Sequence, residues 1–433
     1  MQKLKHSVSH PSQFSKRIPL YSLLTSALIG LNLIAFSSLT LSYPVQSREA
    51  ASTKQAFSVH VKAFKEKPAP VDHSKPVKLI DTSALLPKPQ ALKFIKNWGL
   101  FNTTRKDSHI NAPAAWSIQR GNKSIVVAVI DTGADPNHPD LKRNLWRDPN
   151  NPKAFGKDFV NNNGFPVDTH GHGTHVSGII GSIVDQKTGM SGVAPNITVL
   201  PVKYYSPTAG GAGNLANTIK ALNWAIDQEG VRIINYSGGG PEFCADEYKA
   251  IKRARDKGIL IVAAAGNERS NIDHPSNAYF PASYGLDNIL VVAATDIQNH
   301  LLPTSNYGLK KVHVAAPGDN IFSTISGGGY TLMTGTSQAT AFVSGLSALI
   351  LSENPNLNPQ QVRAIISKTT DPISELKGKI ASGGKINAYR ALLASKNQLL
   401  KVGSHKPTSP YSLDRNLAGL IHELSEKSLM NNL

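Results

Sequence analysis

The stretch Ser124–Ile130, SIVVAVI, runs without a break into Asp131-Thr132-Gly133. It carries no charge and is almost wholly apolar, which is typical of a strand buried on both faces of a parallel sheet. Five further, mostly apolar runs of similar length follow along the chain: Ile197–Lys203, Val231–Asn235, Ile259–Ala264, Asn288–Ala293 and Val312–Ala316.

Segments with helical periodicity lie between and after these runs: Asn214–Asp227, Glu242–Lys257, Ser337–Glu353 and Pro359–Ser367. Strands that alternate with helices are typical of an α/β fold, in which right-handed crossovers place helices over the sheet. The sequence therefore predicts a mostly parallel central sheet with helices on both faces.

Unusual polar residues follow the strands or open the helices. Asp131 comes directly after the first strand, and Asn267 closely follows the run Ile259–Ala264. His172 lies in the stretch DTHGHGTHVSG and Ser337 in GTSQATA, each of which opens an apolar helix. Groups beyond the carboxyl ends of parallel strands lie at one edge of the sheet. A serine becomes a nucleophile when a base takes its proton and an acid orients that base, so Asp131, His172 and Ser337 have the residue types of a catalytic triad.

Nine collinear segments between residues 110 and 395 together resemble the subtilisin family (subtilases) of serine endopeptidases. They are VAVIDTGADPNHPDL, HGTHVSGIIG, GVAPN, IINYSGGGP, VAAAGNE, YFPASY, SNYG, AAPGDNI and GTSQATAFVSG. The resemblance implies a subtilisin-like three-layer fold and peptide hydrolysis through an acyl-enzyme. It assigns Asp131 as the orienting acid, His172 as general base and then acid, Ser337 as nucleophile and Asn267 as an oxyanion donor. The chain order Asp, His, Ser is that of subtilisin.

The same resemblance implies the walls of a substrate cleft: Ser237, Gly238, Gly239, Gly240, Ala264, Ala265 and Gly266. Gly211, within Gly210–Gly213, would pair with the substrate on the other side, since an extended peptide binds by adding as a strand. A flexible loop is the alternative for Gly210–Gly213. Gly238 stands where a leucine is usual in the family, which predicts a wider wall.

The resemblance also implies a structural Ca²⁺ ion, which prefers carboxylate and carbonyl oxygens. Asp140 matches a family ligand, and residues 183–190 match the family's calcium loop. In that loop Asp185 would supply a carboxylate, and Ile183, Thr188 and Met190 would supply carbonyls. A solvated turn with Asp140 as a cap is the alternative.

Two other classes of function are weighed against a serine endopeptidase. The run THGHGTH resembles the THxHxDH zinc motif of metallo-β-lactamase-fold hydrolases, but Thr174 stands where that motif needs Asp. A zinc hydrolase would also leave GTSQAT and AAAGN unexplained. The other class is a catalytically silent subtilase-fold protein that only binds peptides; the presence of all four chemical residues argues against it.

The N-terminal region predicts export. Four cations, Lys3, Lys5, Lys16 and Arg17, precede the uncharged, largely apolar stretch 18–43, which is typical of a signal or an anchor. We therefore expect four parts: an export signal or membrane anchor (1–47), a basic, Pro-containing pro-region or spacer (48–97), the catalytic domain (98–395) and a C-terminal tail (396–433). The protein would be secreted or extracytoplasmic, and membrane-anchored only if residues 18–43 are retained.

The composition limits the partners. The 433 residues carry a net charge of +17, but residues 1–95 contribute +9 and residues 96–395 only +6. So mild an excess over 300 residues argues against nucleic-acid binding by the catalytic domain. Cys244 is the single cysteine, which excludes an intramolecular disulfide. We expect a monomer whose partners are protein or peptide substrates.

Overall fold

The computed structural model describes residues 95–402, with side chains up to residue 396. The predicted export segment, nearly all of the predicted spacer 48–97 and most of the predicted tail lie outside the described residues. No helix within residues 95–402 is both long and apolar enough to cross a membrane.

The described chain is built on a nine-stranded sheet in the order β10-β11-β7-β6-β5-β4-β1-β3-β2. The strands are β1 (Val126–Asp131), β2 (Lys157–Asp158), β3 (Thr198–Lys203), β4 (Val231–Tyr236), β5 (Leu260–Ala264), β6 (Ile289–Thr295), β7 (Val314–Pro317), β10 (Asp371–Pro372) and β11 (Gly384–Lys385). All neighbours run parallel except the edge pair β10 and β11. The predicted parallel sheet is confirmed, with its six long runs placed to within two residues.

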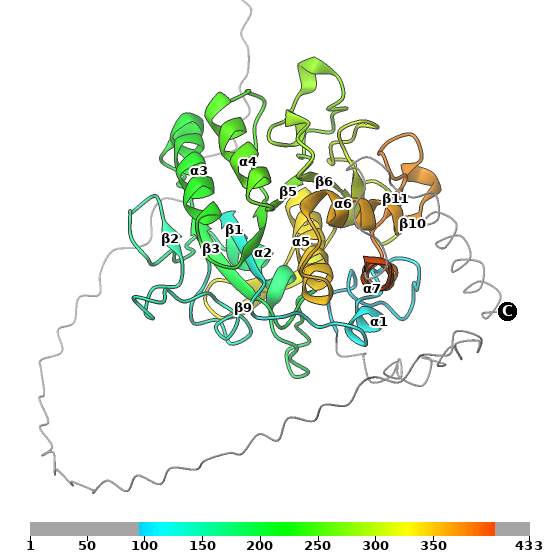
Figure 1. The fold of residues 1–433 in the computed structure, drawn as a ribbon, viewed down its shortest axis with the longest axis horizontal. Helices are drawn as coiled ribbons and strands as arrows, with labels where there is room; N and C mark the ends of the chain where they lie inside the picture. The colour runs from blue at the N-terminus through cyan, green and yellow to red at the C-terminus, as the bar shows by residue number, and fades with distance from the viewer. Residues whose placement is uncertain (1–94, 403–433) are drawn as a thin grey trace, which may run out of the picture. The chain divides into compact units, whose positions relative to one another are not determined.

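Helices cover both faces of this sheet, as Figure 1 shows. The helices are α1 (Ala112–Trp116), α2 (His172–Gly181), α3 (Gly210–Ile226), α4 (Ala245–Asp256), α5 (Thr336–Glu353), α6 (Pro359–Lys368) and α7 (Ala388–Val402). Alternate residues of β1 face opposite ways: Val127 and Val129 pack in one core with α2 and α5, whereas Ala128 and Ile130 pack in a second core with α3 and α4. Two buried faces explain why β1 is apolar throughout.

Three features differ from the sequence-based expectations. A separate antiparallel hairpin, β8 (Ile321–Ile325) and β9 (Gly329–Met333), packs on α2. Helix α3 begins at Gly210, four residues before its predicted start. Helix α7 crosses the predicted domain end at residue 395 and packs against α1 and α5, so the helical part of the domain extends into the predicted tail.

Short 3₁₀ helices complete the described elements: Pro275–Asn277, Ala282–Tyr284 and Ser374–Leu376. The carboxyl ends of β1, β4 and β5, which are neighbours in the sheet, lead into the segments that hold Asp131, Ser237 and Asn267. The N-termini of α2 and α5 bring His172 and Ser337. The fold thus gathers residues from five elements at one edge of the sheet.

Candidate active site

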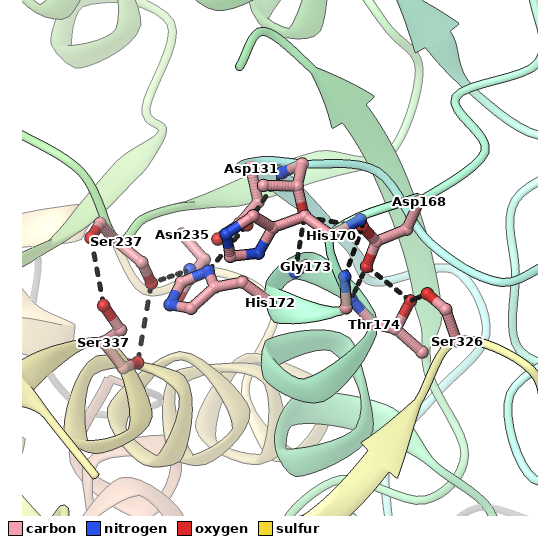
Figure 2. A network of polar contacts seen from close by, with 12 residues as sticks. Asp131, Asp168, His170, His172, Gly173, Thr174, Asn235, Ser237, Ser326 and Ser337 are labelled. Atoms are coloured by element: carbon pink, nitrogen blue, oxygen red, sulfur yellow. Dashed lines mark hydrogen bonds and ion pairs between the residues drawn. The ribbon is translucent and has the colours of Figure 1, made fainter. Parts of the chain in front are cut away.

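The last residue of β1, Asp131, holds the imidazole of His172. Asp131 is only 3% exposed, and its Oδ1 accepts a hydrogen bond from the N–H of Thr132 at 2.7 Å. The same oxygen lies 2.7 Å from Nδ1 of His172 (Figure 2). Because a carboxylate can only accept, Nδ1 carries the proton and Nε2 is left as the basic nitrogen.

The pKa of His172 reflects two opposed effects. Burial alone disfavours the imidazolium, but the charge of the Asp131 carboxylate and its hydrogen bond favour it, and the net effect raises the pKa above the ordinary value. A raised pKa makes Nε2 a stronger proton acceptor. The arrangement suits a general base that becomes charged during a reaction.

Asp168 fixes the start of α2, which carries His172. Its carboxylate accepts hydrogen bonds from the hydroxyls of Thr132 (2.9 Å) and Thr174 (2.7 Å). It also accepts from the N–H groups of His170, Gly171 and Thr174 at 2.8–2.9 Å. Burial alone would raise the pKa of Asp168, but these hydrogen bonds lower it. Asp168 opens the quoted DTHGHGTH stretch, yet nothing in the sequence shows that it joins β1 to α2.

Ser337 is the second residue of α5 and is 8% exposed. Its hydroxyl donates to the carbonyl of Ser237 at 3.2 Å, and within the described residues no hydrogen bond joins it to His172. Figure 2 shows the edge of the His172 ring opposite Asp131 turned toward Ser337. A turn of the Ser337 side chain about Cα–Cβ would redirect its hydroxyl to Nε2. Catalytic hydrogen bonds often form only when substrate is bound.

Asn267 lies beside the N-terminus of α5. Its Oδ1 accepts from the N–H and the hydroxyl of Thr336 at 3.0 and 3.2 Å. Its Nδ2 has no hydrogen-bond partner within residues 95–402, and Asn267 is exposed. The N–H of Ser337, in the first turn of α5, is likewise outside the helical ladder. Two donors are therefore available near the serine hydroxyl, at the positive end of the helix dipole.

The neighbouring histidines differ from His172. His175 is fully buried, and its Nε2 donates to the carbonyls of Ile321 (3.0 Å) and Thr331 (3.3 Å). Burial lowers the pKa of His175 to about 4, so it is neutral and structural. His170 is exposed and its ring meets the rings of His172 and Tyr205 edge-on. Beside it lies a cavity of about 250 Å³, lined in part by His170 and Tyr205.

The segments predicted to wall a cleft come at the carboxyl ends of β4 and β5. Ala264 and Ala265 are buried, whereas residues 237–240 are partly or fully exposed. Ser237 is tied to the core, since its hydroxyl accepts from Asn235, whose amide oxygen accepts from Ser344 of α5. This link fixes the wall relative to the helix that carries Ser337.

Gly211 departs from its predicted role. It lies in the first turn of α3, and a helical backbone cannot pair with an extended peptide as a strand would. The structure also differs from the prediction of a wider wall at Gly238, because the phenol of Tyr204 occupies that space.

The residues predicted to bind calcium come together in part. Asp140 is 1% exposed; its Oδ2 accepts from the hydroxyls of Tyr330 (2.7 Å) and Thr188 (3.3 Å). Its Oδ1 is buried and has no hydrogen-bond partner among residues 95–402. Such an orphaned carboxylate oxygen fits a cation.

The loop after α2 supplies the other predicted ligands. Ile183 donates its N–H to the carbonyl of Asp140 (2.9 Å), which fixes the loop beside that carboxylate. The Asp185 carboxylate accepts from the N–H of Lys187 (2.7 Å), and the Met190 carbonyl from the N–H of Asp185 (2.9 Å). No group of three or more His, Cys, Asp or Glu side chains gathers at a possible metal site in the described part of the chain, so carbonyls would have to complete this one.

Comparison with known proteins decides the family. A sequence model described as the subtilase family, a family of peptidases, matches residues 122–401. The chain belongs to the subtilase family. Membership excludes the zinc-hydrolase interpretation of the HGHGTH stretch, and all nine collinear segments lie in the matched region.

Several subtilases are similar to the chain. Thermophilic serine proteinase of Bacillus sp. (strain AK1) is 38% identical over 64% of this chain and 64% of its own length. Thermitase of Thermoactinomyces vulgaris is 35% identical over 65% of this chain and 93% of its own. Subtilisin-like protease 2 of Plasmodium falciparum is 36% identical, but the chain spans only 23% of its length. The first is named as a serine proteinase and the third as a subtilisin-like protease.

Solved structures agree with the fold. A protease of Pseudoalteromonas arctica PAMC 21717 has a TM-score of 0.58 at 26% identity, covering 69% of this chain and 97% of its own. A cold-adapted subtilisin-like serine proteinase has a TM-score of 0.51 at 28% identity, covering 61% and 87%. The subtilisin-like fold predicted for the chain is confirmed.

Proposed function

We propose that this subtilase is a serine endopeptidase in which Asp131, His172 and Ser337 form the catalytic triad. The observation that supports the proposal is the 2.7 Å contact between Asp131 Oδ1 and His172 Nδ1, with the opposite edge of the imidazole turned toward Ser337. This leaves Nε2 unprotonated on the side that faces Ser337, which lies in the first turn of α5.

In the first step Ser337 Oγ attacks the peptide carbonyl carbon while His172 Nε2 takes its proton. The imidazolium that forms is stabilised by the carboxylate of Asp131. The negative charge on the carbonyl oxygen would be met by the Ser337 N–H and the Asn267 amide. Because those donors are already oriented, they stabilise the transition state with little reorganisation.

The intermediate collapses when His172 donates its proton to the leaving amine, which departs and leaves an acyl group on Ser337 Oγ. Water then attacks the ester carbonyl, again with His172 as base. His172 then returns that proton to Ser337 Oγ as the bond between Oγ and the acyl carbon breaks, which releases the carboxylic acid and restores the free serine. All proton transfers therefore pass through one nitrogen, Nε2 of His172.

The substrates would be proteins or peptides bound along Ser237–Gly240 and Ala264–Gly266. Small residues there let a peptide backbone approach the protein closely. We expect a monomer that makes no use of nucleic acid.

Labelling with a fluorophosphonate tests the proposed function, since this reagent bonds to an activated serine. We expect one label per chain on Ser337 and none on Ser337→Ala. If the protein folds but is neither labelled nor able to cleave casein, it is instead a catalytically silent, peptide-binding subtilase.

We further propose a structural Ca²⁺ ion held by the carboxylates of Asp140 and Asp185. The carbonyls of Ile183, Thr188 and Met190 would complete its ligands. The buried, unpartnered Oδ1 of Asp140 supports this proposal. Calcium bound only by the folded state stabilises it by about 2.7 kcal/mol at a 100-fold excess over Kd. The melting temperature should rise with calcium and fall with chelator, and Asp185→Ala should remove this difference. A melting temperature that does not change with calcium up to ten millimolar would contradict the site.

We also propose that the enzyme is exported by residues 1–47 and that residues 48–97 are a pro-region or spacer. The cationic residues before the apolar stretch 18–43 support export. N-terminal sequencing and the mass of the mature product from the cell's exterior test this. An intact N-terminus on protein recovered only from the cytoplasm would contradict it.

A further inference from the structure

The wall segment Ser237–Gly240 has no side chain at Gly238, but the structure leaves no gap there. A Cβ atom placed on Gly238 would lie 2.4 Å from the hydroxyl oxygen of Tyr204 and 3.2 Å from Cε2 of Tyr236. The first separation is far below van der Waals contact. The phenol of Tyr204 therefore occupies the place that a side chain at position 238 would take.

Tyr204 is held by the same strands that position the active site. It directly follows β3, and its N–H donates to the carbonyl of Asp131 at 3.1 Å. Its ring meets that of Tyr205 edge-on, with 6.2 Å between centroids, and the Tyr205 ring meets His170 in the same way at 5.8 Å. The phenol thus belongs to a packed row of rings that leads from the wall to His172.

The hydroxyl of Tyr204 has no hydrogen-bond partner within residues 95–402, although the side chain is half-buried. Burial raises the pKa of Tyr204, so the hydroxyl keeps its proton. Tyrosine hydroxyls in such surroundings usually have a partner. At Gly238 the hydroxyl adjoins the backbone of Ser237–Gly240, which is partly or fully exposed. A peptide bound along this segment would offer carbonyl acceptors.

We propose that Tyr204 is a substrate-binding residue that determines specificity. Its ring closes the wall at Gly238, so that only a small substrate side chain fits against this part of the cleft, and its hydroxyl donates a hydrogen bond to the bound peptide. The proposal rests on the proposed function, because it requires a peptide to lie along Ser237–Gly240.

Two substitutions of Tyr204 separate the two roles. Tyr204→Phe keeps the ring and removes the hydroxyl, so we expect KM to rise about two- to tenfold while kcat changes little. Tyr204→Ala opens the wall, so kcat/KM for peptides with a large side chain at one position should gain about tenfold or more over peptides with a small one. Tyr389→Phe removes the same hydroxyl on α7 and should leave KM and size preference unchanged.

A double-substitution cycle tests the contact with Gly238 directly. Gly238→Leu alone should lower kcat/KM at least tenfold, because the new side chain collides with the phenol. Adding Tyr204→Ala should restore most of the loss, since the leucine then fills the vacated space. Independent, additive effects of the two changes would overturn the inference.

The same peptides are titrated against chain carrying Ser337→Ala, with and without Tyr204→Ala, to measure binding without cleavage. Failure of the wild type to cleave or to take the fluorophosphonate would refute the proposed function alone. An unchanged size preference in both binding and cleavage after Tyr204→Ala would refute the role of Tyr204 alone. Melting curves for each variant identify any loss of fold, and Tyr204→Phe preserves the test if Gly238→Leu does not fold.

Discussion

Replacing Asp168 by Ala should destabilise the fold and loosen the position of His172. The Asp168 carboxylate is 4% exposed and accepts five hydrogen bonds. They come from two threonine hydroxyls, at 132 and 174, and from three N–H groups at the start of α2. Asp168→Ala removes all five at once and leaves the backbone donors next to His172 without their acceptor.

The magnitude follows from these contacts. A hydrogen bond contributes about 0.5–1.5 kcal/mol net, and more when the acceptor is charged. Some of the freed donors lie beside exposed His170 and will bind water instead, so we expect a loss of about 3–5 kcal/mol. In a domain of this size 1 kcal/mol lowers the melting temperature by about 2–4 °C. The fall in Tm should therefore be about 10 °C, with a smaller fall for Asp168→Asn, which keeps the shape and loses the charge.

The pH dependence of this loss provides an independent check. The pKa of Asp168 is lowered below its ordinary value of 3.8 in the folded state. Its stabilisation is therefore complete above about pH 4 and disappears as pH falls through the lower, folded-state pKa. The gap in Tm between wild type and Asp168→Ala should narrow on acidification.

Thermal unfolding followed by circular dichroism measures the fall in Tm and its dependence on pH. Asp246→Ala is the matched control, because Asp246 is exposed and, within residues 95–402, pairs only with Lys249 at the surface of α4 (2.9 Å). This change should cost about 0.5 kcal/mol or less. The reasoning is refuted if Asp168→Ala melts within 2 °C of wild type at pH 7, or if the gap is as wide at pH 2.5 as at pH 7.

Four further predictions concern catalysis and buried charge. Ser337→Ala or His172→Ala should lower kcat by about 10⁶-fold in a peptide-cleavage assay, the scale known for subtilisin; full activity in either would contradict the triad. Asn267→Leu should lower kcat about 10²–10³-fold with little change in KM, because its amide meets a charge present only in the transition state; a raised KM with kcat spared would contradict that role. Because the pKa of His172 is raised above the ordinary value of 6.5 and only neutral imidazole accepts a proton, kcat/KM should fall to half its maximum at a pH above 6.5 on acidification. A half-maximal kcat/KM at a pH well below 6 would contradict this prediction. Burial lowers the pKa of Lys385 from 10.5 to about 8, so between these pH values the unfolded chain holds a proton that the folded chain has lost. The stability of the wild type relative to Lys385→Met should therefore rise by about 3 kcal/mol as pH increases through this range. Guanidinium unfolding at pH 7.5 and 10.5 measures this difference in stability, and a difference that is the same at both pH values would contradict the prediction.

Much of the molecule follows from local sequence. A strand buried on both faces has to be apolar along its whole length, so β1 is recognisable as the run SIVVAVI, and the helices that cover it show their own periodicity. Asp131, His172, Ser337 and Asn267 lie in short segments whose residue types state their chemistry. These features depend on residues that are close together in the chain, so they can be recognised from the sequence.

The rest depends on contacts between segments far apart in sequence. Gly211 has the composition of a flexible substrate-binding loop, but it lies in the first turn of α3, which begins at Gly210. Nothing in the sequence links Asp168 to Thr132, whose hydroxyl the fold brings to 2.9 Å from the Asp168 carboxylate. The sequence predicts a wider wall at Gly238, but in the structure Tyr204, which directly follows β3, fills that space. Sequence alone determined the sheet, its helices and the candidate catalytic residues, because periodicity and motif chemistry are local. Only the tertiary structure decided which side chains surround those residues, because space in a packed protein is filled by whichever segment the topology brings there.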